Sequence, residues 1–186
     1  SEHNELTDEI AEGLLRTVIR NGKTAIKDAH NYDAMSEVMW AGSLSHNGLT
    51  GCGAVVGGDF ASHALEHEIG GIYDVAHGAG LAAVWGSWAR YVYKDCLPRF
   101  EKFAMNVMQV NPEGTAEEVA LRGIEAMETF FREIGMPTAI HELGIEPGEE
   151  DLKLMAHKCS IASKGSKGSA KVLHEEDMYK IYKAAL

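Results

Sequence analysis

The residues best suited to chemistry in this sequence are three closely spaced histidines, His63, His67 and His77. His63 and His67 are four positions apart, which places both side chains on one face of a helix. Gly70 and Gly71 predict a break in that helix, after which His77 can return to the same place from the start of the next helix. Imidazole is a good ligand for iron or zinc. The pattern therefore predicts a metal or catalytic site.

Apolar residues surround these histidines, so we expect the cluster to be at least half buried. The neighbouring Glu66 and Glu68 could also bind a metal, but a helix directs them to other sides than the His63–His67 pair. An HxxxH spacing alone also fits a structural role in packing or capping, and the sequence does not contain the HExxH motif of zinc proteases.

The remaining histidines are isolated along the chain, and we expect most of them to be surface or satisfied core residues. This group comprises His3, His30, His141, His157 and His174. His46 and Asn47 could approach the pocket, although packing is the favoured role for both. Tyr73 or Asp74 could form a hydrogen bond that orients His67.

Helical patterns dominate the chain and strand patterns are scarce. Caps, breakers and apolar spacing predict helices over about 7–21, 31–47, 59–69, 77–92, 98–107, 115–134, 149–158 and 175–185. A glycine-rich connection is expected at Gly51–Gly58 and a mobile basic loop at Ser160–Ala170. The predicted fold class is all-α, an irregular bundle of about eight helices.

Composition narrows the functional classes. The net charge of −11 disfavours nucleic-acid binding. No apolar run approaches the ~18 residues of a membrane span. Three widely spaced cysteines predict no disulfide scaffold, a reducing cytoplasm, and thiols that act as small buried hydrophobes. The first residues lack the pattern of a signal peptide. Because the chain does not open with methionine, we expect it to be part of a longer protein.

The string His63-x-x-x-His67, followed after nine residues by His77-Gly78, resembles the histidine signature of the iron-containing alcohol dehydrogenase family. Further segments resemble its NAD(P)H-dependent butanol dehydrogenase branch, and the likeness covers almost the whole chain. They are 12–19, 32–42, 44–48, 73–82, 135–138 and 142–145. A small departure is Phe60, where relatives often have Trp.

The resemblance implies that residues 1–186 form the helical metal- and substrate-binding domain, and that the N-terminal nucleotide-binding domain is absent from this chain. It implies that His63 and His77 bind Fe²⁺, or Zn²⁺ in its place, and that His67 lines the active site without binding metal. The metal would act as a Lewis acid on the oxygen of a small alcohol or aldehyde. Hydride would pass to or from NAD(P), which the missing domain binds.

Two further metal ligands would come from an Asp-x-x-x-His motif, and Asp28-Ala-His30 has the wrong spacing for it. The fragment alone is therefore expected to be inactive, and the whole enzyme is expected to be a homodimer.

Three alternatives stay open. A glycerol dehydrogenase-like enzyme or a dehydroquinate synthase would share the two-domain plan. A non-enzymatic helical interaction domain would show an exposed apolar stripe and packed histidines. A helical metal carrier would need a complete ligand set, which the sequence does not contain. The choice of NAD or NADP, and the length of the alcohol, cannot be inferred from these residues.

Overall fold

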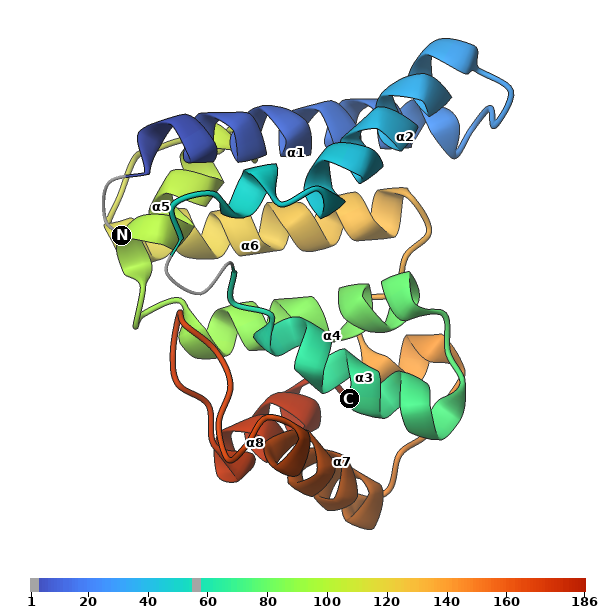
Figure 1. The fold of residues 1–186 in the computed structure, drawn as a ribbon, viewed down its shortest axis with the longest axis vertical. Helices are drawn as coiled ribbons and strands as arrows, with labels where there is room; N and C mark the ends of the chain where they lie inside the picture. Colours follow the sequence, from blue (N-terminus) through green and yellow to red (C-terminus); the bar gives the residue numbers. More distant parts are fainter. Residues whose placement is uncertain (1–3, 55–57) are drawn as a thin grey trace.

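A computed structural model describes residues 4–54 and 58–186, and within these ranges the chain is helical (Figure 1). The α-helices are α1 (Glu5–Ala25), α2 (Tyr32–His46), α3 (Ala61–Tyr73), α4 (His77–Val92), α5 (Leu97–Asn106), α6 (Ala116–Glu133), α7 (Glu149–Ala162) and α8 (Glu175–Ala184). Two 3₁₀ turns, η1 (Leu49–Gly51) and η2 (Ile140–Leu143), connect them. The described residues contain a single isolated β-bridge, Lys167–Leu173. The predicted all-α bundle of eight helices is confirmed. His3 and part of the glycine-rich connection lie outside the described residues.

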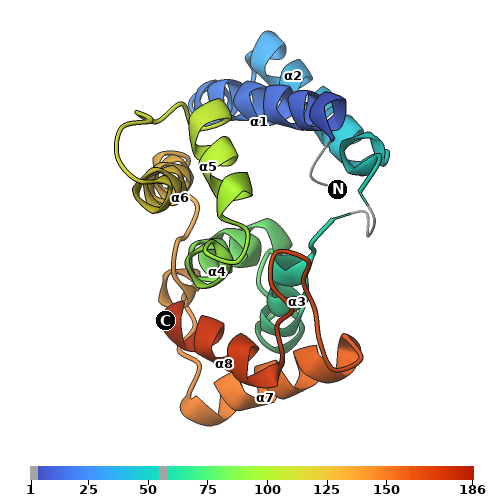
Figure 2. The same cartoon turned by 90° about the vertical axis from the view of Figure 1, so that its left-hand side faces the viewer.

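The helices form two groups that α4 joins. Figures 1 and 2 show α1, α2, α5 and α6 in one group, and α3, α7 and α8 in the other. Helix α4 packs against α3 and α8 on one side and against α6 on the other. Small residues on several of its faces are buried, among them Gly80, Ala83, Gly86 and Ala89. Such residues let neighbouring backbones approach closely, so α4 can be the shared central helix.

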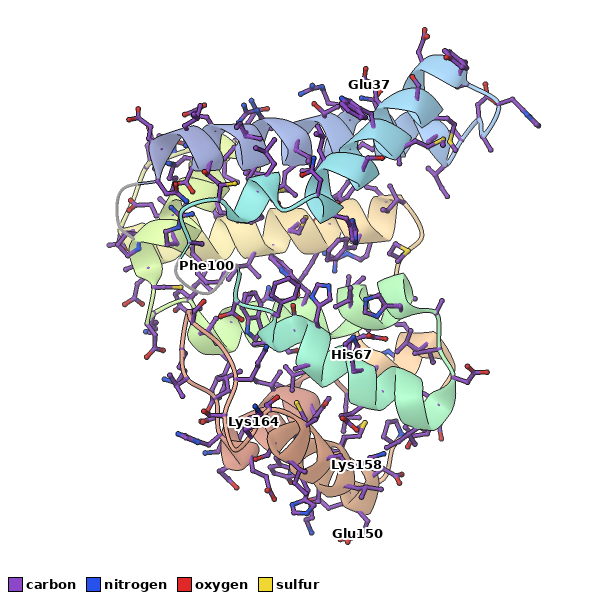
Figure 3. The ribbon with its side chains drawn as sticks, in the orientation of Figure 1. Glu37, His67, Phe100, Glu150, Lys158 and Lys164 are labelled. Carbon is purple, nitrogen blue, oxygen red and sulfur yellow. The ribbon has the colours of Figure 1, made fainter. Side chains whose placement is uncertain are left out.

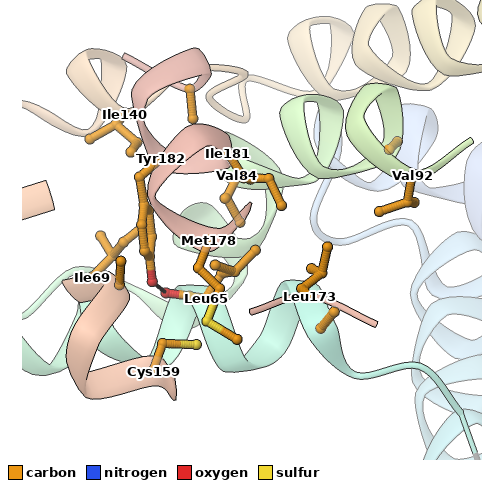
Figure 4. Packing of buried hydrophobic residues seen from close by; sticks show 14 of the residues in the cluster. Leu65, Ile69, Val84, Val92, Ile140, Cys159, Leu173, Met178, Ile181 and Tyr182 are labelled. Carbon is orange, nitrogen blue, oxygen red and sulfur yellow. Dashed lines mark hydrogen bonds between the residues drawn. The ribbon is translucent and has the colours of Figure 1, made fainter. Parts of the chain in front are cut away.

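The main core lies between α3, α4, α7 and α8 and is centred on Tyr182 (Figure 4). The Tyr182 side chain is fully buried, and its hydroxyl donates a hydrogen bond of 2.6 Å to the backbone carbonyl of Leu65. Burial raises the pKa of Tyr182 well above its usual range. This bond crosses 117 positions of sequence and fixes α8 beneath the middle of α3.

Helix α1 differs from its prediction at both ends. Thr7 does not cap it but lies inside it, where its hydroxyl donates to the Cys52 carbonyl at 2.9 Å. The helix also passes through Gly22 and ends at Ala25. A β-carbon at position 22 would lie 3.6 Å from the Phe130 ring, which is an ordinary contact distance, so Gly22 neither ends α1 nor is required by the packing there.

An ion-pair cluster fastens α1 to α5. The buried Asp8 carboxylate accepts two hydrogen bonds from Arg99, at 2.5 and 2.7 Å, and one from Lys102 at 3.0 Å. The hydrogen bond from Arg99 is the largest cause that lowers the pKa of Asp8, to about 2. Asp8, in the first turn of α1, therefore links this helix to α5.

The crossing of α5 and α6 depends on two small residues. A β-carbon at Gly123 would lie 2.4 Å from the Ala104 β-carbon and 2.7 Å from its α-carbon. Helix α6 starts where predicted, and its start is a capping box in which the Thr115 amide donates to the Glu118 carboxylate at 2.7 Å and the Glu118 amide donates to the Thr115 hydroxyl at 3.3 Å.

Two sequence expectations are wrong in this part of the molecule. Cys159 is buried as expected, but Cys52 is exposed because it lies in the connection after η1. The basic loop is tied down rather than free: Asp59 accepts hydrogen bonds from the Ser169 and Ala170 amides, and Lys171 pairs with Asp95 at 2.9 Å. Asp59 and Asp95 thus hold a loop in place although its composition is typical of flexible coil.

No helix in the described ranges is both long enough and apolar enough to cross a membrane.

Candidate metal centre

Helix α3 and the first residue of α4 carry the three histidines. The chain does not turn at the double glycine: α3 runs through Gly70 and Gly71 to Tyr73, so the predicted break is wrong. The reversal occurs at Asp74, whose φ of 53° is left-handed, and its amide still donates to the Gly70 carbonyl at 2.9 Å. Aspartate tolerates this conformation better than most residues. His77 then opens α4 beside α3.

This turn brings the three imidazoles together. The ring centroids of His63 and His77 are 5.4 Å apart, and those of His67 and His77 are 5.6 Å apart. Figure 3 shows His67 on the face of α3 that looks away from α7 and α8. His63 and His67 thus each approach His77. Within the part of the chain that the structure describes, the group of potential ligand atoms that lie within 4.8 Å of one another contains His67 and His77 but not His63.

Glu66, which the sequence analysis set aside as a ligand because it lies on another side of the helix than the His63–His67 pair, contacts His77. Its carboxylate accepts a short hydrogen bond from the Nδ1–H of His77, and its side chain is only 2% exposed. Among the described residues, Glu66, His67 and His77 form a group whose potential ligand atoms all lie within 4.8 Å of one another. Glu66 and His67 are adjacent on α3, so their side chains point to different sides of the helix. The position of α4 brings His77 within reach of Glu66.

The cluster is more open than expected. His63 is half-buried, whereas His67 is exposed and the His77 side chain is 52% exposed. The apolar neighbours that suggested burial, such as Leu65 and Ile69, face the core on the opposite side of α3. The expectation of a half-buried cluster holds for His63 alone.

The surroundings of His63 favour its neutral form, in which a ring nitrogen can bind a metal. Burial lowers the pKa of His63, and the neighbouring His77 and His67 lower it further, against the opposing effect of Glu66. A lowered pKa favours the neutral imidazole, which is the form that can bind a metal.

The wall beside His63 is aromatic. Phe60 adopts a left-handed φ of 53° just before α3, and its ring meets His63 edge-on at a centroid distance of 5.2 Å. Asp59 does not occupy the N-cap position, which belongs to Phe60 and lacks a side-chain cap bond. The Asp59 carboxylate instead accepts from the amide of Ala61, the first residue of α3, at 2.9 Å. Phe60 thus occupies the place where the resemblance led us to expect a pocket wall.

The other suggested neighbours have structural partners. The pKa of Tyr73 is raised by burial and by a hydrogen bond with Asp151. The His46 ring bonds to the Ser45 hydroxyl and the Gly42 carbonyl, and the Asn47 side chain accepts from the Leu49 amide. Both residues are exposed, so the favoured packing role is not seen, and their bonds are local ones at the end of α2. His46 also lies near enough to His63 to contribute to the lowering of its pKa.

The spacing of the imidazoles fits a shared metal ion. A metal–nitrogen distance of about 2.0–2.1 Å allows the centres of two rings on one ion to be at most about 6.4 Å apart. The His63–His77 and His67–His77 separations both fall below this limit. With Nδ1 of His77 bonded to Glu66, its Nε2 is left free to face an ion.

Comparison with known proteins identifies the family of the chain. The model of the Fe-containing alcohol dehydrogenase family, C-terminal, matches residues 1–186. NADH-dependent butanol dehydrogenase A of Clostridium acetobutylicum is 35% identical over 95% of this chain and 44% of its own length. The NADPH-dependent aldehyde reductase YqhD of Escherichia coli is 33% identical over 76% of this chain and 36% of its own.

Solved structures show the same similarity. NADH-dependent butanol dehydrogenase A of Thermotoga maritima superposes with a TM-score of 0.89 at 35% identity, over 97% of this chain and 46% of that one. The aldehyde reductase YqhD of E. coli gives 0.90 at 28% identity, over 98% and 47%. The chain thus spans about half the length of these relatives. It belongs to the iron-containing alcohol dehydrogenase family and matches the C-terminal region of its members.

Proposed function

We propose that this chain is the helical metal- and substrate-binding half of an NAD(P)-dependent alcohol dehydrogenase that also reduces aldehydes. The observation that carries the proposal is the convergence of His63 and His77, whose ring centroids lie 5.4 Å apart across the α3–α4 turn. The similarity to NADH-dependent butanol dehydrogenases supports the same substrate class, a small alcohol or aldehyde.

His63 and His77 would hold the metal, iron or zinc, through one imidazole nitrogen each. The bound metal supplies a Lewis acid and the nicotinamide supplies or accepts hydride. His67 lies 5.6 Å from His77 between ring centroids, on the exposed face, where it can hydrogen-bond the substrate or exchange a proton with it. Phe60 contacts His63 edge-on from the start of α3.

The chain covers 44% of the length of butanol dehydrogenase A, so we propose that the rest of the natural protein supplies what these residues lack. That part would contain the nucleotide-binding domain and the Asp-x-x-x-His ligands. It would also cover the exposed faces of His67 and His77, which explains why the cluster is open here. We expect the whole enzyme to be a cytoplasmic homodimer and the 186-residue chain alone to be inactive.

The test uses the full-length protein loaded with Fe²⁺, with butanal reduction followed by NADH or NADPH oxidation and metal content measured after dialysis. His63→Ala combined with His77→Ala should abolish both metal retention and turnover. His67→Ala should lower turnover while metal is retained, because we place His67 beside the substrate. His157→Ala is the matched control, since His157 is exposed on α7 and pairs with Glu175.

Unchanged activity and metal content in the double variant would refute the proposal. If His67→Ala loses the metal while His63→Ala retains it, then His67 is the metal ligand and His63 is the residue beside the substrate. A substrate panel of butanal, glycerol and 3-hydroxypropanal then distinguishes a butanol dehydrogenase from a glycerol dehydrogenase-like enzyme.

A further inference from the structure

A buried carboxylate stands directly behind the proposed metal ligands. The Glu66 side chain is 2% exposed, and the hydrogen-bond partner that the structure gives it is Nδ1 of His77. Burying a carboxylate is strongly unfavourable unless a partner compensates for the lost water. An apolar residue would suit this position in the core better, so packing alone does not explain why it is an acid.

Two glycines make the space that this carboxylate occupies. A β-carbon at Gly80, on α4, would lie 2.8 Å from both Cγ and Oε1 of Glu66. A β-carbon at Gly70, one turn further along α3, would lie 3.0 Å from Oε1. Because Gly80 is buried against α3, a larger residue there would push the Glu66 side chain away from His77.

The contact with Glu66 also determines which ring nitrogen of His77 is available to a metal. An imidazole whose Nδ1–H is held by a carboxylate has its proton on Nδ1, so its Nε2 lone pair is free. A carboxylate in this place also fixes the orientation of the ring and makes it a stronger donor. The Glu66 side chain reaches His77 from the core side, and the ring is open on its other side.

We propose that Glu66 is a positioning residue that holds His77 with Nε2 toward the metal, and that Gly80 keeps Glu66 in place. This inference rests on the proposed function, because it takes His77 as a ligand. The competing interpretation is that Glu66 binds the metal itself, since its oxygen lies within 4.8 Å of the ligand atoms of His67 and His77. The engagement of Oε2 by His77 and the burial of the side chain favour the positioning role.

The experiment measures the affinity of the full-length apoprotein for Co²⁺, by competition with a chromophoric chelator. Glu66→Ala and Gly80→Ala should each weaken binding by about 10–100-fold, the usual effect of removing a partner that orients a metal-binding histidine. Glu66→Gln should be weakened less than tenfold relative to the native protein, because its amide oxygen still accepts the Nδ1–H bond.

Two variants serve as matched controls. Gly71→Ala places the same methyl group on α3 with nothing within 4 Å, and Glu68→Gln alters a neighbouring acid whose carboxylate faces Lys158 at 3.7 Å. Both should bind Co²⁺ like the native protein. In a Glu66→Ala background, Gly80→Ala should cause no further loss, because the atoms it would displace are gone.

Each result decides between the interpretations. If Glu66→Gln binds as weakly as Glu66→Ala, Glu66 is a direct ligand and the positioning role is overturned. If Glu66→Ala and Gly80→Ala bind normally while His77→Ala does not, the inference fails but the proposed function stands. If His77→Ala also binds normally, the proposed function itself fails. Should Glu66→Ala not fold, the comparison of Glu66→Gln and Gly80→Ala with Gly71→Ala decides the question.

Discussion

Replacing Gly123 with alanine should destabilise the protein although alanine is the better helix former. The added β-carbon would lie 2.4 Å from the β-carbon and 2.7 Å from the α-carbon of Ala104, whereas ordinary contacts are 3.4–4 Å. The α-carbon belongs to the backbone of α5 and cannot rotate away. Helices α5 and α6 must therefore separate by about 1 Å, which loosens packing along the whole crossing.

The magnitude follows from two opposing effects. Overpacking a core costs about 1–3 kcal/mol, and the rigid backbone obstacle places Gly123→Ala at the upper end of that range. Alanine recovers about 1 kcal/mol of helix propensity relative to glycine. The net loss is about 1–2 kcal/mol, or roughly 2–8 °C in the midpoint of thermal unfolding for a chain of this size.

Urea and thermal unfolding followed by circular dichroism measure this loss. Gly42→Ala is the control, because it adds the same methyl group within α2 where nothing lies within 4 Å. That variant should gain about 0.4–1 kcal/mol. A Gly123→Ala protein as stable as the Gly42→Ala protein would show that the close crossing of α5 and α6 is not a constraint on the fold.

Three further outcomes are expected. Asp8→Asn should lose about 1–2 kcal/mol at pH 7, since the lowered pKa of about 2 gives stability that is present above the unfolded pKa of 3.8 and disappears as pH falls toward 2. The expected loss is smaller than the full pKa shift implies because the Arg99 partner of Asp8 is partly exposed. Acid titrations of stability that coincide for the native protein and Asp8→Asn would contradict this prediction. Tyr182→Phe should lose about 1 kcal/mol in urea unfolding by leaving the Leu65 carbonyl without its 2.6 Å donor, and equal midpoints would exclude that contribution. A thiol reagent should modify exposed Cys52 promptly and Cys159 only on unfolding, because burial raises the pKa of Cys159 to about 11; equal rates would speak against it.

The helices themselves were largely predictable from local chemistry. The capping box at Thr115 and the proline near the start of α5 each act within one turn of the chain, so sequence alone reveals them. The breaks predicted at Gly22 and at Gly70–Gly71 were wrong because α1 and α3 continue through these glycines. Of the three, Gly70 is the one where an added side chain would be tight, since a β-carbon there would lie 3.0 Å from the Glu66 carboxylate one turn earlier.

The candidate site was predictable in part. The spacing of His63, His67 and His77 predicts that they meet, and the resemblance to a known family assigns their roles, which remain predictions. Glu66 could not be identified from helical periodicity, because its partner comes from the next helix and depends on the turn at Asp74. One signal was available, an acidic residue between two histidines on an otherwise apolar stretch of helix.

The hydrogen bond from Tyr182 to Leu65 has a consequence for the order of events during synthesis. At about 5–20 residues per second, the ribosome produces Tyr182 roughly 6–23 s after Leu65, since 117 positions separate them. During that interval the histidine-bearing helix has emerged but lacks the tyrosine that supports it from below. We therefore expect the proposed metal site to form only after synthesis has reached α8.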